Sequence, residues 1–268
     1  MFNYSEISAP PALKSYLRKF WIIDNLQNSS PSETKYALPN GCFTIAFIND
    51  AGVTLQYDKH SIHVPKGIYL FGQINTRLKI IVQPHTKAIM AQLTPWSASL
   101  ITNFPLHELT NNFIDLKLVN AGLHQKFQNI NYLDEHLLFT EFCKAFENLG
   151  STSTSNIIKS IYALFETGHS MASFNMTELA AKAGYSKRYI EKKFNAHIGI
   201  SPGDYYAILR LRNLINELDN TGNQLSLGHL AHKHGYFDQS HFIKAYSKIM
   251  GSLPKQFQST DYILPFNN

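Results

Sequence analysis

The sequence predicts an α+β protein of two domains: a β-rich N-terminal domain over residues 1–150 and an all-helical C-terminal domain over residues 156–260. Three observations predict this division. Short runs of β-branched and aromatic residues, separated by turn residues, occupy positions 41–93. Beyond residue 156, apolar residues recur at helical spacing. Between the two parts lies a small, polar stretch, Gly150–Asn156, whose composition is typical of a linker.

The N-terminal runs predict a small β-barrel or a sandwich, with flanking helices. The predicted strands are Gly41–Ile48, Val53–Tyr57, Gly67–Phe71, Leu78–Val82 and Ala88–Leu93. The aromatic side chains on these strands either fill a core or line a pocket for an apolar or aromatic effector, and both interpretations stay open. These candidate effector-binding residues are Phe43, Phe47, Tyr57, Tyr69 and Phe71.

Helical patterns follow the strands. Thr94 and Pro95 form a cap and first-turn pair that predicts the start of a helix. Asp134–Leu149 is predicted to be a helix with one apolar face, formed by Leu138, Phe142, Ala145, Phe146 and Leu149. That face packs either on the core of its own domain or on a second copy of the chain. A further helix is predicted over Ile157–Glu166, with Gly168 as its C-cap.

Composition excludes several classes of protein. With 44% hydrophobic and 16% charged residues, the chain is globular rather than disordered. The N-terminus lacks the basic and apolar regions of a signal peptide, and no apolar run is long enough to span a membrane. The two cysteines, Cys42 and Cys143, form no zinc-binding pattern and suit a reducing compartment. We therefore expect a cytoplasmic protein that does not enter a membrane.

Catalytic and metal-binding patterns are also missing from the sequence. On a strand, His60 and His63 would point to opposite faces, so we expect a surface turn there rather than a metal site. Cys42 follows a Pro-Asn-Gly turn and is either a redox sensor or a small buried apolar residue. The sequence contains no nucleophile elbow, phosphate-binding loop or pair of catalytic carboxylates. We expect neither an enzyme nor a bound cofactor.

The C-terminal part contains an internal repeat. Leu179–Tyr185 (LAAKAGY) and Leu230–Tyr236 (LAHKHGY) are identical at five of seven positions, at an offset of 51 residues. Such self-similarity indicates one supersecondary unit used twice. Positive charge is concentrated here too, because residues 170–268 contain 11 Lys and Arg against 7 Asp and Glu, a balance of +4 in a chain of net charge +5. A basic excess suits a polyanionic partner.

Each repeat predicts two helices joined by a tight glycine turn, the helix-turn-helix layout. In the first copy Thr177 caps the first helix, and Gly184 makes the turn at positive φ. Ser186 then caps the second helix, which buries Ile190 and Phe194 at positions i and i+4.

The second copy has the same pattern with a turn one residue longer. Asp238 takes the cap position, and Phe242 and Tyr246 form the buried pair, now at an offset of 52. Between the copies, a Ser-Pro pair at 201–202 opens a helix that is predicted to run to about Leu218.

Residues 176–257 resemble the DNA-binding domain of the AraC/XylS family. The matching motifs are LAxxxGYSxRYIxxxF from Leu179, GISP at 199–202, RLR at 210–212, HGYFDQSHFIKAY from His234 and GSLPKQF at 251–257. The last motif departs mildly from the family, which usually has Val or Met and then Ser or Thr at 252–253. His232 and His234 replace small residues, a change that we expect to weaken packing. The resemblance implies a bacterial, sequence-specific DNA-binding regulator of transcription.

The N-terminal part resembles a cupin-like domain of unknown function that some members of this family carry. The resemblance rests on LKSYLRKFWIID from Leu13, the Pro-Asn-Gly-Cys block at 39–42, and TPWSASLITNFPLHELTN from Thr94. It implies a β-barrel that acts as a sensor or a dimerisation module, without identifying an effector. The partners expected from the whole chain are double-stranded DNA, a small-molecule effector, RNA polymerase and a second copy of the chain.

The face opposite each buried pair is free to read DNA, and the family's base-contacting positions fall on these faces. The candidate DNA-binding residues are Lys187, Arg188, Tyr189, Glu191, Lys192, Lys193, Gln239, Ser240, His241, Ile243 and Lys244. Of these, Glu191 either accepts a hydrogen bond from cytosine or pairs with Lys187, and Lys193 either contacts phosphate or supports the domain. The helix between the units, roughly 26 Å long, can hold two recognition helices about 34 Å apart, one turn of DNA.

Overall fold

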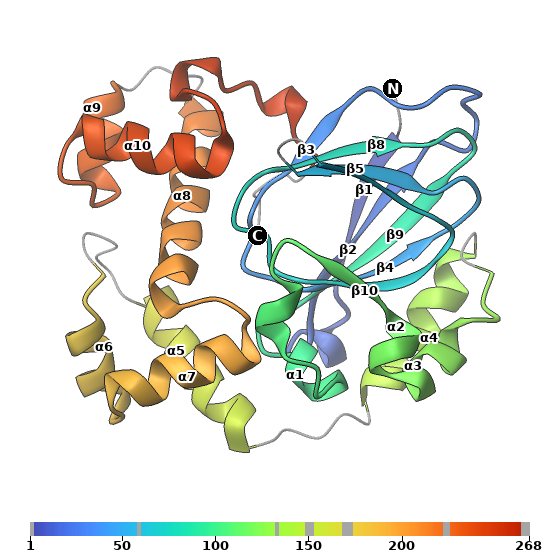
Figure 1. Ribbon diagram of the computed structural model, residues 1–268, viewed down its shortest axis with the longest axis horizontal. Coiled ribbons are helices and arrows are strands. Elements are labelled where there is room, and N and C mark those ends of the chain that lie inside the picture. The colour runs from blue at the N-terminus through green and yellow to red at the C-terminus, as the bar shows by residue number, and fades with distance from the viewer. Residues whose placement is uncertain are drawn as a thin grey trace.

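The computed structural model describes residues 3–57, 60–131, 134–147, 153–167, 174–221 and 226–263, and places a β-rich N-terminal part beside a helical C-terminal part (Figure 1). One sheet has six strands in the order β1-β2-β9-β4-β7-β10, and a second has four in the order β3-β8-β5-β6. Neighbouring strands are antiparallel throughout both sheets. The strands are β1 Asn3–Ser8, β2 Leu17–Asp24, β3 Lys35–Ala37, β4 Thr44–Ile48, β5 Val53–Tyr57, β6 His60–Val64, β7 Gly67–Phe71, β8 Leu78–Val82, β9 Lys87–Leu93 and β10 Phe113–Asp115.

The two sheets pack face to face as a sandwich, which is one of the two forms that the sequence predicts; the closed barrel is not formed. Alternate side chains of the six-stranded sheet serve two cores, because both of its faces are covered. Trp21, Ala46 and Met90 point toward the four-stranded sheet. Phe20 and Phe47 point the other way, toward the helices that cover the sheet. The central strand β9 is buried at every residue for this reason.

Most predicted strands are confirmed, and one begins later than predicted. The observed β5, β7 and β8 have the predicted bounds, and β9 begins one residue earlier. In the run predicted from Gly41, however, strand β4 begins only at Thr44. Gly41 has φ +73°, and the backbone N–H of Cys42 donates to the side chain of Asn40 at 2.9 Å. Residues 40–42 therefore form a turn ahead of the strand.

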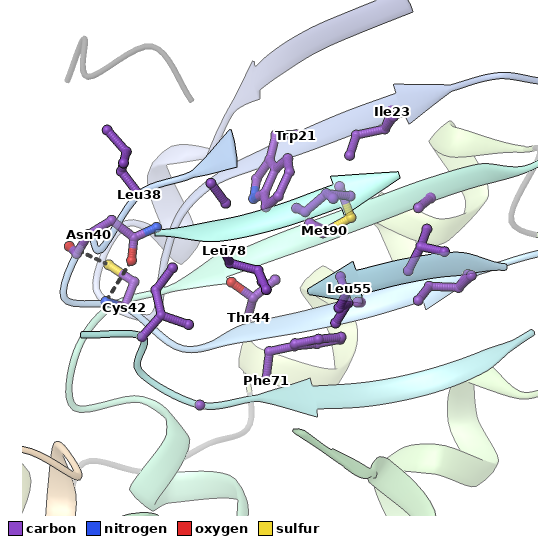
Figure 2. Close-up of a pocket in the computed structure, with 18 residues that line it drawn as sticks. Trp21, Ile23, Leu38, Asn40, Cys42, Thr44, Leu55, Phe71, Leu78 and Met90 are labelled. Atoms are coloured by element: carbon purple, nitrogen blue, oxygen red, sulfur yellow. Dashed lines mark hydrogen bonds between the residues drawn. The ribbon is translucent and has the colours of Figure 1, made fainter. Parts of the chain in front are cut away.

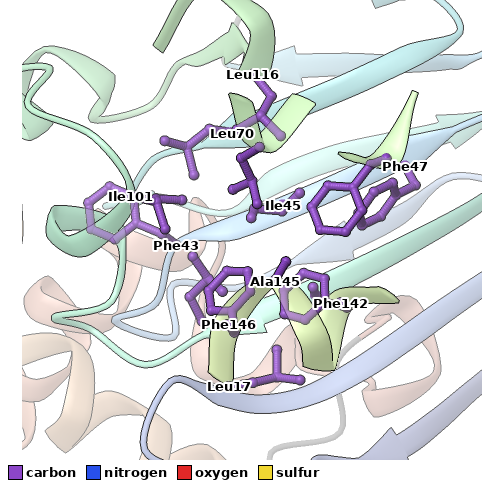
Figure 3. Close-up of a cluster of buried hydrophobic side chains, with 14 of the residues drawn as sticks. Leu17, Phe43, Ile45, Phe47, Leu70, Ile101, Leu116, Phe142, Ala145 and Phe146 are labelled. Atoms are coloured by element: carbon purple, nitrogen blue, oxygen red, sulfur yellow. The ribbon is translucent and has the colours of Figure 1, made fainter. Parts of the chain in front are cut away.

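Helix α4 spans Glu135–Glu147. The sequence left open whether its apolar face packs on its own domain or on a second copy of the chain. Leu138, Phe142 and Phe146 are completely buried within the chain itself, in the core beneath the six-stranded sheet (Figure 3). Phe142 and Phe146 stack with ring centroids 4.3 Å apart. The face packs on its own domain, which excludes a dimer interface there; Leu149 lies outside the described residues.

Short helices complete this core. They are α1 Ala98–Ile101, α2 Leu116–Val119 and α3 Ala121–Phe127. The helix predicted to start at Thr94 and Pro95 begins at Ala98 instead, because residues 94–97 form a turn in which the hydroxyls of Thr94 and Ser97 hydrogen-bond at 2.6 Å.

The C-terminal part consists of α5 Ser153–Thr167, α6 Met176–Ala183, α7 Lys187–His197, α8 Pro202–Thr221, α9 Leu227–Lys233 and α10 Gln239–Met250. Figure 1 shows α8 as a rod that joins two compact helical units. Of the predicted linker, residues 150–152 lie outside the described residues, as does Gly168, and α5 begins at Ser153. Among the described residues, no helix is long and apolar enough to cross a membrane.

Candidate nucleic-acid interface

The first helix-turn-helix unit is built from α6 and α7. Its cap is Asn175 rather than the predicted Thr177: the Asn175 side chain accepts hydrogen bonds from the N–H groups of Thr177 and Glu178, at 2.8 and 3.3 Å. Thr177 already lies inside the first turn. Gly184 ends α6 at φ +72°, a left-handed conformation that glycine adopts without steric cost.

Helix α7 follows this turn as predicted. The Ser186 hydroxyl accepts from the N–H of Tyr189 at 3.2 Å and caps the helix. Ile190 and Phe194 are completely buried against the core of the unit. The opposite face carries exposed charged side chains, namely Lys187, Arg188, Glu191 and Lys192.

Tyr189 and Lys193 lie at the edge of the exposed face of α7. The Tyr189 ring stacks on Tyr185 with centroids 5.1 Å apart. The Lys193 ammonium lies 5.5 Å from the centroid of the Tyr189 ring. The edge is therefore an ordered aromatic and cationic group rather than a set of independent side chains.

The second unit repeats this geometry with α9 and α10. The Asp238 carboxylate accepts from the N–H of His241 at 2.7 Å and caps α10, as predicted. Gly235 makes the turn at φ +72°. Phe242 and Tyr246 are completely buried. The face opposite them exposes Gln239, Ser240, His241 and Lys244, whereas Ile243 is half-buried against the core of its own unit.

Arg210 on α8 ties the two units together. Its guanidinium lies 3.9 Å from the centroid of the Tyr236 ring and 5.6 Å from that of Tyr206. It also donates to the carbonyl of Gly235 at 3.3 Å, in the turn of the second unit. These contacts give Arg210 a supporting role between the two units.

A polar cluster also joins α8 to α9. Glu217 accepts from Lys233 at 2.7 Å and hydrogen-bonds His234 at 2.9 Å. Burial works to raise the pKa of Glu217, but the two hydrogen bonds outweigh it and lower that pKa. Burial lowers the pKa of His234 despite the opposing effect of Glu217. His234, expected to weaken packing where the family has a small residue, is a hydrogen-bonded partner of α8.

The N-terminal sandwich contains an apolar cavity of about 80 Å³ between its sheets (Figure 2). Of the five aromatic residues proposed for an effector, Phe71 lines this cavity. Tyr69 packs beside Phe71 in the same core, and Tyr57 lies at its margin. Phe43 and Phe47 lie on the other side of the sheet, in the core under α4 (Figure 3).

The remaining cavity wall comes from residues that sequence reasoning missed, among them Trp21, Leu38 and Met90. Trp21 and Met90 are on strands, where the alternation of side chains between the two faces of the sheet was the signal that could have placed them on the cavity side. Leu38 lies between strands, so no periodicity marked it. Cys42 also lines the cavity and is 4% exposed, which agrees with its interpretation as a small buried apolar residue.

The two histidines considered as metal ligands lie on a strand rather than the expected surface turn. His60 and His63 belong to β6, which pairs with β5 and forms an edge of the four-stranded sheet. Four of the five residues of β6 are exposed. The strand therefore lacks the alternation of apolar and polar residues by which a half-buried strand is predicted from sequence. In the described part of the chain, no three His, Cys, Asp or Glu side chains are grouped as a metal site would require.

Comparison with known proteins adds to this geometry. A helix-turn-helix domain family matches residues 179–260, and a domain of unknown function (DUF6597) matches residues 5–115. None of the curated proteins matches the sequence.

Solved structures with a similar arrangement include ToxT from Vibrio cholerae O395, at 14% identity, with 96% of this chain and 95% of that chain covered and a TM-score of 0.46. The C-terminal domain of AraT, a response regulator from Geobacillus stearothermophilus, is 22% identical; the match covers 44% of this chain and 95% of that chain, with a TM-score of 0.37. The AraC-like transcriptional activator CuxR is 8% identical over 80% of this chain and 86% of that chain, with a TM-score of 0.28.

The family match coincides with the duplicated unit whose geometry is described above. It begins at Leu179, in the first helix of the first unit, and ends just beyond the second unit. Each unit presents a capped helix with a buried pair on one face and polar side chains on the other. The chain is a DNA-binding transcription regulator whose C-terminal part carries a helix-turn-helix domain of the matched family, behind an N-terminal domain of a family of unknown function.

Proposed function

We propose that one chain reads two successive major-groove segments of double-stranded DNA, one with α7 and one with α10. The observation that carries the proposal is that both helices present exposed polar faces and are joined by α8. The 20 residues of α8 give a rod of about 30 Å at about 1.5 Å per residue. That length is close to the roughly 34 Å between equivalent groove positions one turn apart.

Side-chain chemistry assigns a role to each exposed position. Arg188 and Lys192 donate to guanine O6 and N7, and Gln239 pairs with adenine. Ile243 offers its partly exposed side chain to a thymine methyl group. Lys193, beside Tyr189, contacts phosphate, which positions α7 without reading sequence. The other proposed contacts are Lys187, Glu191, Ser240, His241 and Lys244.

A binding titration on selected and scrambled duplexes tests this function. Arg188→Ala is expected to cost about 1–3 kcal/mol on the selected duplex and little on the scrambled one. Gln239→Ala should relax selectivity only at the bases read by α10. Lys182→Ala removes an exposed cation from α6 and serves as the control. Equal losses on both duplexes for Arg188→Ala would make that residue a phosphate contact instead.

We also propose that regulation acts through an apolar or aromatic molecule in the sandwich cavity. The cavity wall is almost entirely apolar, with Trp21, Phe71 and Met90 among its residues. Ala46, 2% exposed, projects from β4 into this wall, and Ala46→Leu would fill the space. In a thermal-shift screen, some small aromatic or alicyclic molecules should raise the melting temperature of the wild-type chain. The same molecules should leave the melting temperature of the Ala46→Leu variant unchanged. A screen without any stabilising molecule would argue against an effector of this class.

The segment between β3 and β4 offers a route from this cavity to the DNA-binding units. Leu38 lines the cavity and also packs in the core of the second unit, with Leu211 and Leu214. Gly41 lies so close to Tyr205 on α8 that an added Cβ would come within 2.6 Å of the ring. A molecule that moves this wall therefore moves groups that support both units.

We propose that the chain acts in the cytoplasm, without catalysis or a cofactor, and that its protein partners are RNA polymerase and a second copy of the chain. A direct test is the size of its complex with a single duplex, measured with and without polymerase. A mass equal to one chain per duplex would remove the second copy from this scheme.

A further inference from the structure

The N-terminal domain contacts the same repeat position in both helix-turn-helix units. Gly199 follows α7 and Gly251 follows α10, and the two glycines are 52 residues apart, the offset that relates the buried pairs of the two helices. Both glycines have positive φ, +84° and +61°. Each lies three residues before a proline, Pro202 or Pro254. The repeat therefore extends to the C-terminal end of each recognition helix.

In the first unit, the contact comes from the segment between α1 and β10. The Thr110 hydroxyl donates to the carbonyl of Gly199 at 3.0 Å. The backbone of Leu106 lies so close that a Cβ on Gly199 would come within 2.7 Å of its carbonyl oxygen. Nearby, Trp96 packs edge-on against Tyr162 of α5, with ring centroids 5.1 Å apart.

In the second unit, the contact comes from Arg77, just before β8. Its backbone N–H donates to the carbonyl of Ile249 at 2.8 Å, and its guanidinium donates to the carbonyl of Gly251 at 3.3 Å. Arg77 is itself held by the ring of Tyr36, 4.4 Å away. Cationic and hydroxyl donors suit these positions, because the last carbonyls of a helix lack partners within it.

The two units need such support because their cores are separate. Leu209 belongs to the core of the first unit, whereas Leu211, two residues later on α8, belongs to the core of the second. The units thus meet along a single helix, and a bend in that helix would change the angle and distance between α7 and α10. The N-terminal domain contacts both units, at Gly199 and at Gly251, and these contacts restrict that bend.

We propose that the N-terminal domain is a brace that sets the spacing between the two recognition helices, and so selects the distance between the two DNA segments that the chain binds. This inference rests on the proposed reading of DNA by α7 and α10. It assigns Thr110 and Arg77 a part in specificity although neither lies on a recognition helix. The brace acts on geometry, so it affects spacing rather than the identity of the bases.

The first experiment measures tolerance to spacing in the full-length chain. The brace variant is Thr110→Val with Arg77→Met, which removes both side-chain donors and keeps the apolar volume. The control is Thr140→Val with Lys144→Met on α4, which likewise removes one hydroxyl and one cationic side chain, outside both units. Each protein is titrated against the duplex that the wild type selects from a random pool, and against the same duplex with two base pairs inserted between the half-sites.

The insertion rotates one half-site by about 70° relative to the other. The wild type and the control should bind the duplex with the insertion about tenfold or more weakly than the uninterrupted duplex, because one half-site loses its contacts. The brace variant should lose about threefold or less, because its two units can adjust to the new spacing. Equal losses in all three proteins would overturn the brace. Tighter binding of the uninterrupted duplex by the brace variant would also overturn it, because the contacts would then hold the units away from their DNA-binding geometry.

The second experiment needs no DNA and so separates this inference from the proposed function. Spin labels on cysteines placed at Ala196 of α7 and Lys244 of α10, both exposed, report the distance between the helices in a Cys143→Ser background. The distance distribution should be narrow in the wild type and control and broader in the brace variant. An unchanged distribution overturns the brace whether or not a duplex is found, whereas a broader one without any selected duplex overturns only the reading of DNA.

Discussion

Lys193 differs from its exposed neighbours on α7 because its position is partly fixed. It is half-buried, with its ammonium 5.5 Å from the centroid of the Tyr189 ring. A cation held at the edge of a helix contacts phosphate more readily than base edges, and phosphate contacts set the salt dependence of binding. Lys193→Ala should therefore weaken binding to all duplexes about equally and reduce the salt slope by about one.

Titrations between about 50 and 200 mM salt measure this slope. Lys144→Ala removes an exposed cation from α4 and provides the control, with an unchanged slope expected. A loss confined to the selected duplex would instead make Lys193 a base contact.

We expect His234 to make the stability of the second unit depend on pH. Burial lowers its pKa below the ordinary value, so at mildly acidic pH the unfolded chain binds a proton that the folded chain does not. Stability from this residue is complete above the unfolded pKa of about 6.5 and decreases as pH falls through it. Between pH 7.5 and 5.5, the melting temperature of the wild type should decrease more than that of His234→Ala.

The first unit has an alanine, Ala183, at the position of His234, so the variant keeps a side chain that the repeat tolerates. His229→Ala removes an exposed histidine from α9, the helix that His234 follows, and serves as the control. If His234→Ala has the same pH dependence as the wild type, the titrating group lies elsewhere. Glu217 acts in a lower range, because its pKa is lowered and its contribution disappears only as pH falls through that pKa.

Short-range interactions of single residues were predictable from sequence, and long-range partners were not. Ser186 and Asp238 cap their helices as predicted, because a cap binds N–H groups two or three residues ahead. Asn175 was missed in favour of Thr177, since both are cap-forming residue types and they lie only two positions apart. The partner of His234 is Glu217, 17 residues away on another helix, and no local rule connects them.

At the scale of the element, the cap of α10 is the Asp238 side chain. The Asp238 carboxylate accepts a hydrogen bond from His241 at 2.7 Å and also places a negative charge at the positive end of the helix. Asp238→Ala should cost about 0.5–2 kcal/mol of stability, because an N–H group of the first turn loses its partner.

Urea unfolding measures that cost, and Asp238→Asn provides the matched comparison. Asparagine caps nearly as well but carries no charge, so its stability should stay close to that of the wild type. Should Asn prove as damaging as Ala, the charge rather than the hydrogen bond holds α10 in place.

Strand prediction succeeded where alternation was clear and failed where it was not. Val53–Tyr57 alternates, with Val53 and Leu55 buried, and was predicted with its observed bounds. β2 has apolar residues buried on both faces and a charged start, so it shows no period of two. β6 has one buried residue, because an edge strand packs on one side only. The three-residue strands β3 and β10 are too short to give a pattern.

At the scale of the whole molecule, the assignment of side chains to the cavity depends on strand register. Alternation alone places Tyr69 and Phe71 on one face of their strand and Phe47 on one face of β4. It does not say which faces coincide. The pairing of Ala46 with Tyr69 and of Phe47 with Ile68 puts Tyr69 on the cavity side and Phe47 on the helix side. That register is set by tertiary packing, so it cannot be predicted from the sequence pattern of either strand alone.

The domain boundary leads to the last prediction. The predicted linker Gly150–Asn156 overlaps the start of α5 at Ser153, so its remaining part is residues 150–152. If these residues are the linker, brief subtilisin digestion should cut there first and give two pieces, which mass spectrometry identifies. The two pieces should nevertheless elute together in size-exclusion chromatography, because each domain buries a side chain in the core of the other. Leu38 is 1% exposed and packs in the core of the second unit, and Ile263 is 3% exposed in the sandwich core.

Leu38→Asn places an amide in that shared core, where it lacks a partner of its own, and the burial cost should separate the cut pieces. Ile62→Asn, at an exposed position on β6, should leave them together. Cleavage at another position would move the boundary. Separation of the wild-type pieces would mean that the covalent linker, rather than these buried side chains, keeps the domains in contact, and an effector in the sandwich would then have no packed route to α8.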